Sequence, residues 1–281
     1  MTIDAHQHFW VLNRFTSNFP KPEHGAIYRS FLPEDLEPVL AAAGVEGTVV
    51  VQAAPALEET EWLLNITAPR PWVRGVVGWV NLDQPPGALH RDLDRLVRFP
   101  KLVGVRPMLQ DLPDLDWILR PQVVHNLRQL ADHHLTLDLL IYDRHIPTVL
   151  RALPQVPALC AVVDHAAKPG IRTGAWEPWA SSVARLANLP QVSCKVSGLV
   201  TEANPDRWGP LDLTPYIRHV VSAFGPGRVM FGSDWPVCLE VTSYQRVYDT
   251  VREWADTALS HAERESLFGL SAARFYHLPS V

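Results

Sequence analysis

The stretch TIDAHQHFW at residues 2–10 begins with a short β-rich run and ends that run in two histidines. No glycine-rich phosphate loop follows it, which argues against an open, doubly wound sheet, the alternative for an alternating β/α chain. Seven further apolar runs occur along the 281 residues, each followed by a helical pattern. The runs are continuously apolar, as parallel strands covered on both faces should be. The sequence therefore predicts an α/β fold, a single-domain (β/α)8 TIM barrel over residues 1–281.

The expected elements alternate along the whole chain. Pro33 suits the first turn of the first helix, and Gly44 suits its end. The expected strands cover residues 2–6, 48–52, 73–80, 102–106, 135–141, 160–164, 192–196 and 229–232. The expected helices cover residues 33–43, 57–67, 87–98, 117–134, 144–153, 176–187, 215–224, 243–256 and 261–276.

The composition argues against several classes of protein. A formal net charge of −5 without a basic run argues against nucleic acid or an anionic membrane as a partner. No apolar stretch approaches the ~20 residues of a spanning helix, and no signal-peptide pattern opens the sequence. The three cysteines, Cys160, Cys194 and Cys238, are too few and too far apart for a disulfide framework. We therefore expect a cytoplasmic protein with reduced thiols and a small-molecule ligand, and a homo-oligomer stays open.

Active sites of such barrels lie at the carboxyl ends of the strands, and the first strand ends in two histidines. Residues two apart on an extended chain project to the same face, so His6 and His8 are expected to point together. Two adjacent imidazoles can share one metal ion. The alternative, two unrelated packed histidines, fits the position at a strand end less well.

The sixth and eighth strands end in further ionisable residues. His165 follows the apolar run of the sixth strand and offers a third imidazole, and Lys168 could polarise a substrate carbonyl. Asp234 follows the last strand, which lies beside the first strand when a barrel closes. It is therefore a candidate metal ligand and general base for a water held near His6 and His8. A helix-capping role for Asp234 is the simpler alternative.

Residues at other strand ends are candidates for substrate binding. Arg106 can hold a carboxylate or a hydroxyl-rich ligand in a fork, although a structural ion pair explains it equally well. Aromatic residues near the motifs could form an apolar wall or simply belong to the core. The remaining candidates for substrate contact are Gln110, Trp10, Tyr28, Lys195 and Glu202.

Five blocks in chain order resemble the amidohydrolase superfamily, and most closely its branch of sugar-lactone hydrolases, such as those of L-fuconolactone and L-rhamnonolactone. The blocks are IDAHQHFW at 3–10, VGVRPMLQD at 103–111, VVDHAAKP at 162–169, KVSGLVTEA at 195–203 and FGSDWPV at 231–237. The resemblance implies a TIM barrel, one divalent-metal site and hydrolysis of a cyclic ester. It places the first-strand histidine pair at His6 and His8, the later histidine at His165 and the last-strand aspartate at Asp234.

The resemblance also implies what the site lacks. Many members of the superfamily carry a lysine on the fourth strand that bridges two metals, whereas this chain has Arg106 there. We therefore expect a single ion, with zinc favoured by imidazole ligands. A decarboxylase of the same superfamily and a non-catalytic binding protein are the alternatives. A serine hydrolase is disfavoured because the sequence has no GxSxG elbow.

Overall fold

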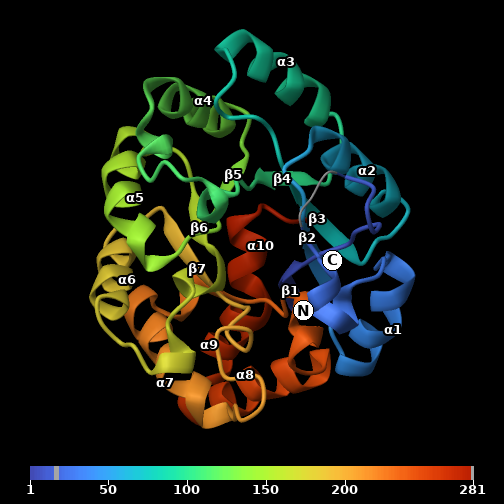
Figure 1. The fold of residues 1–281 in the computed structure, drawn as a ribbon, viewed down its shortest axis with the longest axis vertical. Helices are drawn as coiled ribbons and strands as arrows, with labels where there is room; N and C mark the ends of the chain where they lie inside the picture. The colour runs from blue at the N-terminus through green and yellow to red at the C-terminus, as the bar shows by residue number, and fades with distance from the viewer. Residues whose placement is uncertain (16–18, 280–281) are drawn as a thin grey trace.

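The computed structural model describes residues 1–15 and 19–279, which form an eight-stranded parallel sheet surrounded by helices (Figure 1). The strands follow one another around the sheet in chain order. They are β1 (Ile3–Gln7), β2 (Gly47–Val51), β3 (Val73–Gly78), β4 (Leu102–Val105), β5 (Thr136–Leu139), β6 (Ala161–Val163), β7 (Val192–Val196) and β8 (Val229–Phe231). The predicted TIM barrel is confirmed.

The α-helices lie between the strands and at the end of the chain. Both α1 and α2 have the predicted bounds, because Pro33 opens the first and Gly44, with φ of 69°, ends it. The helices are α1 (Pro33–Ala43), α2 (Leu57–Thr67), α3 (Pro86–Leu96), α4 (Pro121–Asp132), α5 (Ile146–Ala152), α6 (Trp179–Ala187), α7 (Pro210–Phe224), α8 (Tyr244–Ala258), α9 (His261–Glu265) and α10 (Ser271–Phe275).

Several predicted helices have other bounds, and in two of them proline is the reason. The helix expected at 117–134 is divided at Arg120, which is extended, and α4 begins at Pro121. The residue before a proline avoids the helical region, whereas proline itself suits the first helical position. The helix expected at 215–224 begins five residues earlier, at Pro210, so that prediction is also corrected.

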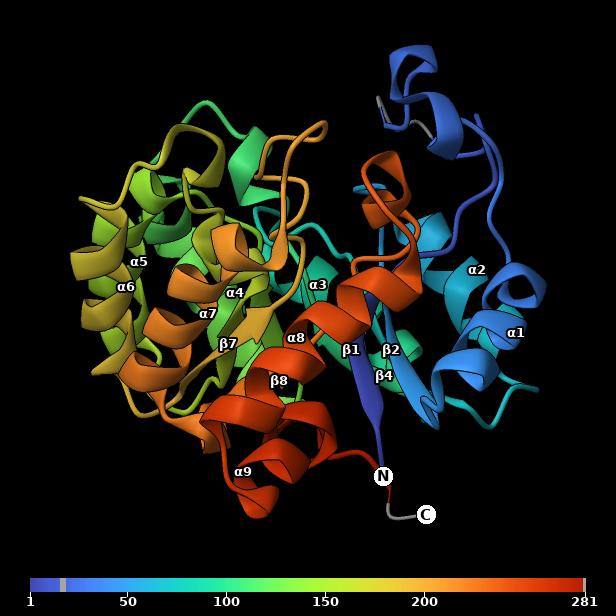
Figure 2. The same ribbon diagram turned by 90° about the horizontal axis from the view of Figure 1, so that it is seen from below.

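The last predicted helix, 261–276, is three pieces. Between α9 and α10 the backbone widens into a π-helical turn, η10 (Ser266–Leu270), which packs against β8 and β1. In Figure 1 α10 lies at the centre of the ring of strands, and in Figure 2 the red C-terminal helices lie at the end where the N-terminus is. The C-terminal segment therefore closes the amino end of the barrel.

The barrel closes between β1 and β8 just beyond the end of β8. Gln7 and Trp235 form a parallel bridge, and the backbone N–H of His8 donates to the Trp235 carbonyl at 2.7 Å. The Asp234 N–H donates to the His6 carbonyl at 2.8 Å. These bonds bring the histidine pair at the end of β1 and Asp234 after β8 together.

The strands fill the barrel interior with side chains, so the barrel is a core and not a pore. At the amino end, the Tyr276 ring packs into this cluster and its hydroxyl donates to Asp138 at 2.8 Å. The interior cluster comprises Ile3, Ala5, Val49, Val51, Val77, Val103, Val162, Met230, Ala272, Tyr276 and Leu278.

The described residues between β1 and α1 extend beyond the carboxyl end of the barrel, and there they include the short helix η1 (Pro22–Ile27) (Figure 2). An antiparallel bridge between Trp10 and Phe31 fixes the base of this excursion. No helix among the described residues is long and apolar enough to cross a membrane. Cys194 and Cys238 are buried and Cys160 is half-buried, and all three thiols are free, as expected.

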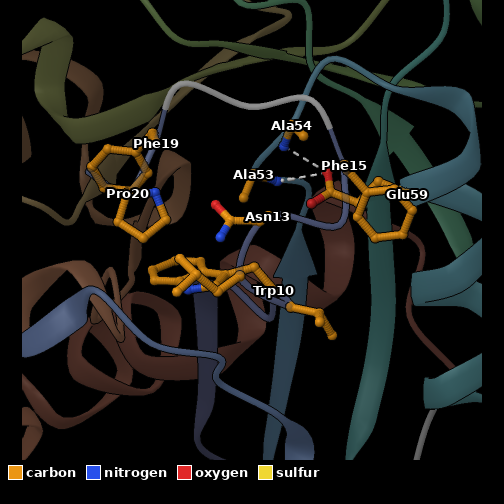
Figure 3. Close-up of a pocket in the computed structure, with 10 residues that line it drawn as sticks. Trp10, Asn13, Phe15, Phe19, Pro20, Ala53, Ala54 and Glu59 are labelled. Atoms are coloured by element: carbon orange, nitrogen blue, oxygen red, sulfur yellow. Dashed lines mark hydrogen bonds between the residues drawn. The ribbon is translucent and has the colours of Figure 1, made fainter. Parts of the chain in front are cut away.

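The Glu59 carboxyl is buried at the start of α2. It accepts the backbone N–H groups of Ala53 at 3.0 Å and Ala54 at 2.6 Å, and so holds the loop after β2 (Figure 3). Burial raises the pKa of Glu59 to about 7, although the two N–H donors and Arg106 oppose that rise.

We predict that Glu59→Gln removes a pH-dependent part of the stability. Because the pKa of Glu59 is about 7 in the folded state against 4.5 ordinarily, the folded protein binds more protons in this window. The wild-type free energy of unfolding should therefore fall as the pH rises through it, by roughly 2–3 kcal/mol. Urea unfolding from pH 5 to pH 8 measures this. A wild-type-to-variant difference that is constant with pH contradicts it, and Glu58→Gln, at an exposed neighbour, is the control.

Candidate active site

An irregularity in β1 orients the side chain of His6 toward the site. Between Asp4 and Gln7, β1 has one residue more than β2 opposite it, as in a β-bulge. Ala5 belongs to the interior cluster, and His6 lies among the polar groups above it. The His6 and His8 Nε2 atoms are 3.2 Å apart, so the two imidazoles point together as their spacing predicts.

Barrel closure brings Asp234 to the same point. The buried Asp4 carboxylate accepts the Ser233 N–H at 2.9 Å and the Ser233 hydroxyl at 2.6 Å, which ties the end of β8 to β1. Asp234 then adopts a left-handed φ of 58°. Its Oδ1 lies 3.2 Å from His8 Nε2 and 3.8 Å from His6 Nε2.

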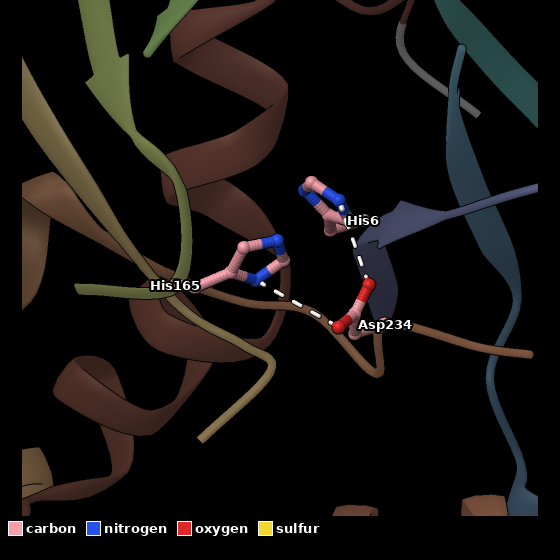
Figure 4. A group of neighbouring side chains, drawn as sticks. All are labelled: His6, His165 and Asp234. Atoms are coloured by element: carbon pink, nitrogen blue, oxygen red, sulfur yellow. Dashed lines mark ion pairs between the residues drawn. The ribbon is translucent and has the colours of Figure 1, made fainter. Parts of the chain in front are cut away.

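The third histidine comes from a strained turn after β6. Four consecutive residues from His165 to Lys168 have φ between 51° and 59°, a conformation that non-glycine residues rarely adopt. The Trp179 indole holds the turn by donating to the Ala166 carbonyl at 2.7 Å. His165 Nδ1 lies 2.9 Å from the Ser197 hydroxyl and 4.0 Å from Asp234 Oδ2 (Figure 4). Such strain concentrates at functional sites.

The electrostatics keep His6 and His165 neutral and Asp234 charged. Burial lowers the pKa of His165 to about 4, against the opposing charges of Asp234 and Asp164. Burial and the Lys195 ammonium hold the pKa of His6 well below its ordinary value. Burial raises the pKa of Asp234, but the neighbouring histidines lower it further, so it lies below its ordinary range. Near neutral pH the Asp234 carboxylate therefore faces the uncharged imidazoles of His6 and His165.

The donor set fits one divalent ion. His8 Nδ1 lies 2.7 Å from the Val51 carbonyl, so it carries the hydrogen and leaves a lone pair on Nε2. A lone pair this close to His6 Nε2 and to Asp234 Oδ1 requires a cation or a proton between them. Ligand atoms of a tetrahedral zinc ion stand roughly 3.3–3.4 Å apart, close to these separations. Ligand atoms of His6, His165 and Asp234 also lie within 4.8 Å of one another.

A layer of buried charges supports His6 from below. Lys195, fully buried on β7, lies 2.5 Å from Asp138 Oδ2, 3.0 Å from Asp164 Oδ1 and 3.1 Å from His6 Nδ1. Arg106 NH1 lies 3.4 Å from Asp164 Oδ2. The structural ion pair that the sequence left open for Arg106 is thus present.

A cavity of about 610 Å³ opens beside these groups, and some of the residues predicted to contact substrate line it. Arg106, Lys168, Gln110 and Trp10 line it, together with His8, His165 and Asp234. Its other lining residues are Phe19, Lys21, His24, Ala53, Pro55, Met108, Asp111, Leu140, Thr201 and Val237.

Three predicted contacts lie elsewhere. Tyr28, Glu202 and Lys195 are absent from the described lining of this cavity. The Lys195 ammonium is enclosed between two carboxylates and His6. Burial raises the pKa of Glu202, and the Lys168 charge opposes that rise.

Sequence reasoning missed Asp138 and Gly198. Asp138 is a charge within an apolar strand, the same signal that singled out Lys195, and it is the partner of that lysine. Gly198 has φ of 61°, and a Cβ there would lie 2.5 Å from His165 Nδ1 and 2.9 Å from Asp234 Oδ2. A lone glycine after a strand gives no sign of such close approach.

The barrel, with a three-histidine and aspartate site at its carboxyl end beside a cavity, defines the chain as an enzyme of the barrel-hydrolase class. It matches the amidohydrolase family over residues 3–278. The chain belongs to that family.

Relatives cover nearly the whole chain. An L-fucono-1,5-lactonase of Burkholderia ambifaria is 41% identical to this chain, and the alignment covers 98% of this chain and 95% of the lactonase. An L-fucono-1,5-lactonase of Burkholderia multivorans is 35% identical, and that alignment covers 99% of this chain and 97% of the lactonase. The crystal structure of a B. multivorans amidohydrolase with bound zinc has a TM-score of 0.90 at 36% identity, covering 99% of this chain and 100% of the other.

We predict that Gly198→Ala destabilises the protein more than Gly44→Ala does. Both glycines have a left-handed φ, so both substitutions cost about 1 kcal/mol or more from backbone strain. A Cβ at Gly44 meets nothing within 4 Å, whereas one at Gly198 collides with His165 and Asp234. The clash should add roughly 1–3 kcal/mol, measured by urea unfolding. Equal losses for the two variants would show that the site yields to the added methyl.

Proposed function

We propose that this protein hydrolyses a sugar-acid lactone, a cyclic ester, to the open hydroxy acid, with L-fucono-1,5-lactone or a similar sugar lactone as substrate. The proposal is supported by the Asp234 carboxylate, which lines the cavity and lies within 4.0 Å of His6, His8 and His165. The activity of the relatives, which align along the whole chain, supports it.

The Asp234 carboxylate is the group that activates water. Because its pKa lies below the ordinary range, it stays ionised and accepts a hydrogen bond from the attacking water. It takes the water proton as oxygen attacks the lactone carbonyl, and returns that proton to the ring oxygen as the C–O bond breaks. The carboxylic acid product then ionises in solution.

Cations on the cavity wall stabilise the charge that develops on the carbonyl oxygen. Lys168 and Arg106 both line the cavity, and His165 lies beside Asp234. Preorganised donors directed at a developing oxyanion stabilise the transition state more than the ground state. A divalent ion held by His6, His8 and Asp234 would add Lewis-acid polarisation and lower the pKa of a bound water.

The cavity suits a single polyhydroxylated ring. Gln110, Lys168 and Thr201 offer hydrogen bonds, whereas Met108 and Leu140 offer an apolar surface for the C–H face of a sugar. The volume of about 610 Å³ lies within the range usual for small-molecule sites.

We predict that Asp234→Asn lowers kcat/KM for lactone hydrolysis by about 10²–10⁴-fold, because the amide cannot take the water proton. A panel of 1,4- and 1,5-lactones of sugar acids, followed by acid release with a pH indicator, measures this. Asp256→Asn, exposed on α8, is the matched control and should match the wild type. Near-normal activity of the Asp234 variant contradicts the mechanism. Carbon dioxide released from an unsaturated or aromatic acid, without lactone opening, would indicate the decarboxylase alternative.

We further propose that the ion is zinc, one per chain. Zinc should raise the melting temperature of the wild type, because an ion that binds the folded state alone stabilises it by mass action. His8→Gln should abolish most of this rise, whereas His261→Gln, at an exposed helix start, should retain it. Differential scanning fluorimetry across a zinc titration makes the comparison. An equal rise in the His8 variant would place the ion elsewhere.

A further inference from the structure

The hydrogen bonds around His6 specify which of its nitrogens carries the proton. The Lys195 ammonium has only donors, and it lies 3.1 Å from His6 Nδ1, so that nitrogen accepts the bond. A neutral imidazole has one N–H, which must then be on Nε2. The His6 Nε2–H points at His8 Nε2, 3.2 Å away, whose lone pair is free because His8 Nδ1 donates to Val51.

Donor and acceptor therefore alternate along this chain without a metal ion, and Asp234 Oδ1 lies 3.2 Å from the His8 Nε2 that accepts the His6 proton. The chain runs from the Lys195 ammonium to His6 Nδ1, from His6 Nε2 to His8 Nε2, and from His8 Nδ1 to the Val51 carbonyl. Each bond lies between 2.7 and 3.2 Å. The proton on His6 Nε2, however, occupies the lone pair through which that nitrogen would bind an ion.

The second tautomer of His6 has an acceptor ready. Asp164 Oδ1 lies 3.0 Å from the Lys195 ammonium, its ion-pair partner, and 3.3 Å from His6 Nδ1. A carboxylate oxygen can accept more than one hydrogen bond, so Asp164 Oδ1 can take a second donor beside the ammonium. It would receive a hydrogen bond if the His6 proton moved from Nε2 to Nδ1.

Lys195 is fixed in the position that favours the first tautomer. Its side chain is fully buried, and Asp138 Oδ2 holds the ammonium at 2.5 Å. Tyr276 in turn fixes Asp138 through bonds of 3.0 and 2.8 Å. The competing cation at His6, Arg106, reaches Nε2 only at 3.5 Å, the limit of a hydrogen bond.

We propose that Lys195 is a positioning residue that holds His6 in the Nε2–H tautomer and thereby opposes metal binding at His6, His8 and Asp234. An ion that binds there must displace the Nε2 proton, which moves to Nδ1 and donates to Asp164 Oδ1. The number of protons on His6 is unchanged, and Lys195 keeps its charge and its bond to Asp138. The site thus has a hydrogen-bonded state and an ion-bound state, whatever the substrate.

Nitrogen-15 NMR of the histidine rings tests the proposal directly in the metal-stripped wild type. Protonated and unprotonated ring nitrogens have well-separated shifts, and His6→Asn and His8→Gln assign the signals. We expect His6 to carry its proton on Nε2 and His8 on Nδ1, and zinc to move the His6 proton to Nδ1. A metal-free His6 with its proton on Nδ1 would overturn the proposal.

Two substitutions around the ammonium test the role of Lys195 itself. Lys195→Met should move the metal-free His6 proton to Nδ1 and raise the affinity for zinc roughly tenfold or more, measured by chelator competition. Asp138→Asn leaves Asp164 Oδ1, 3.0 Å from the ammonium, to keep it beside His6, so the proton should stay on Nε2 and the affinity should not rise. A Lys195→Met protein that binds zinc more tightly with its proton still on Nε2 would overturn the proposal, because lost charge alone explains that result. If Lys195→Met does not fold, the wild-type spectra decide.

Discussion

Closure of the barrel between β1 and β8 is the constraint on which the rest of the site depends. Three features lie within this one seam: the bulge in β1, the Asp4 carboxylate that binds Ser233, and the backbone bond from Asp234 to His6. A Cβ on Gly232 would approach the His6 Cβ to 2.6 Å, so the seam leaves no room for a side chain there. Residues from the two ends of the chain thereby share one site without relying on flexible loops.

Burying the charged groups of the seam would cost folding free energy, and the buried ion pairs beneath the seam offset that loss. Asp138 and Asp164 share the Lys195 ammonium, and Arg106 adds a second cation on the far side of Asp164. Burial raises the pKa of Asp138 to about 6 while Lys195 opposes the rise. Removing one partner from such a cluster leaves an uncompensated charge, which destabilises more than the intact cluster stabilises. The same cluster orients His6, which links the stability of the barrel to the state of the site.

The sequence was sufficient to predict the fold and to predict which strand ends come together, because apolar runs and proline or glycine boundaries are local signals. His6, His8, His165 and Asp234 converge because parallel strands of a barrel end at one rim. The sequence indicates that Lys195 points toward polar groups, but it does not indicate on which side of the barrel they lie. One extra residue in β1 decides which groups face Lys195. The left-handed turn from His165 to Lys168 was not predictable either, because tertiary contacts such as the Trp179 bond impose it on residues that do not favour it.

We propose that this site opens a lactone ring with water. The most direct measurement follows L-fucono-1,5-lactone by carbon-13 NMR with the purified protein near neutral pH, against a protein-free blank. We expect a carboxylate signal to replace the ester carbonyl signal at a rate proportional to protein concentration and well above the blank. A rate equal to the blank for this lactone and for the other sugar lactones of both ring sizes would contradict it.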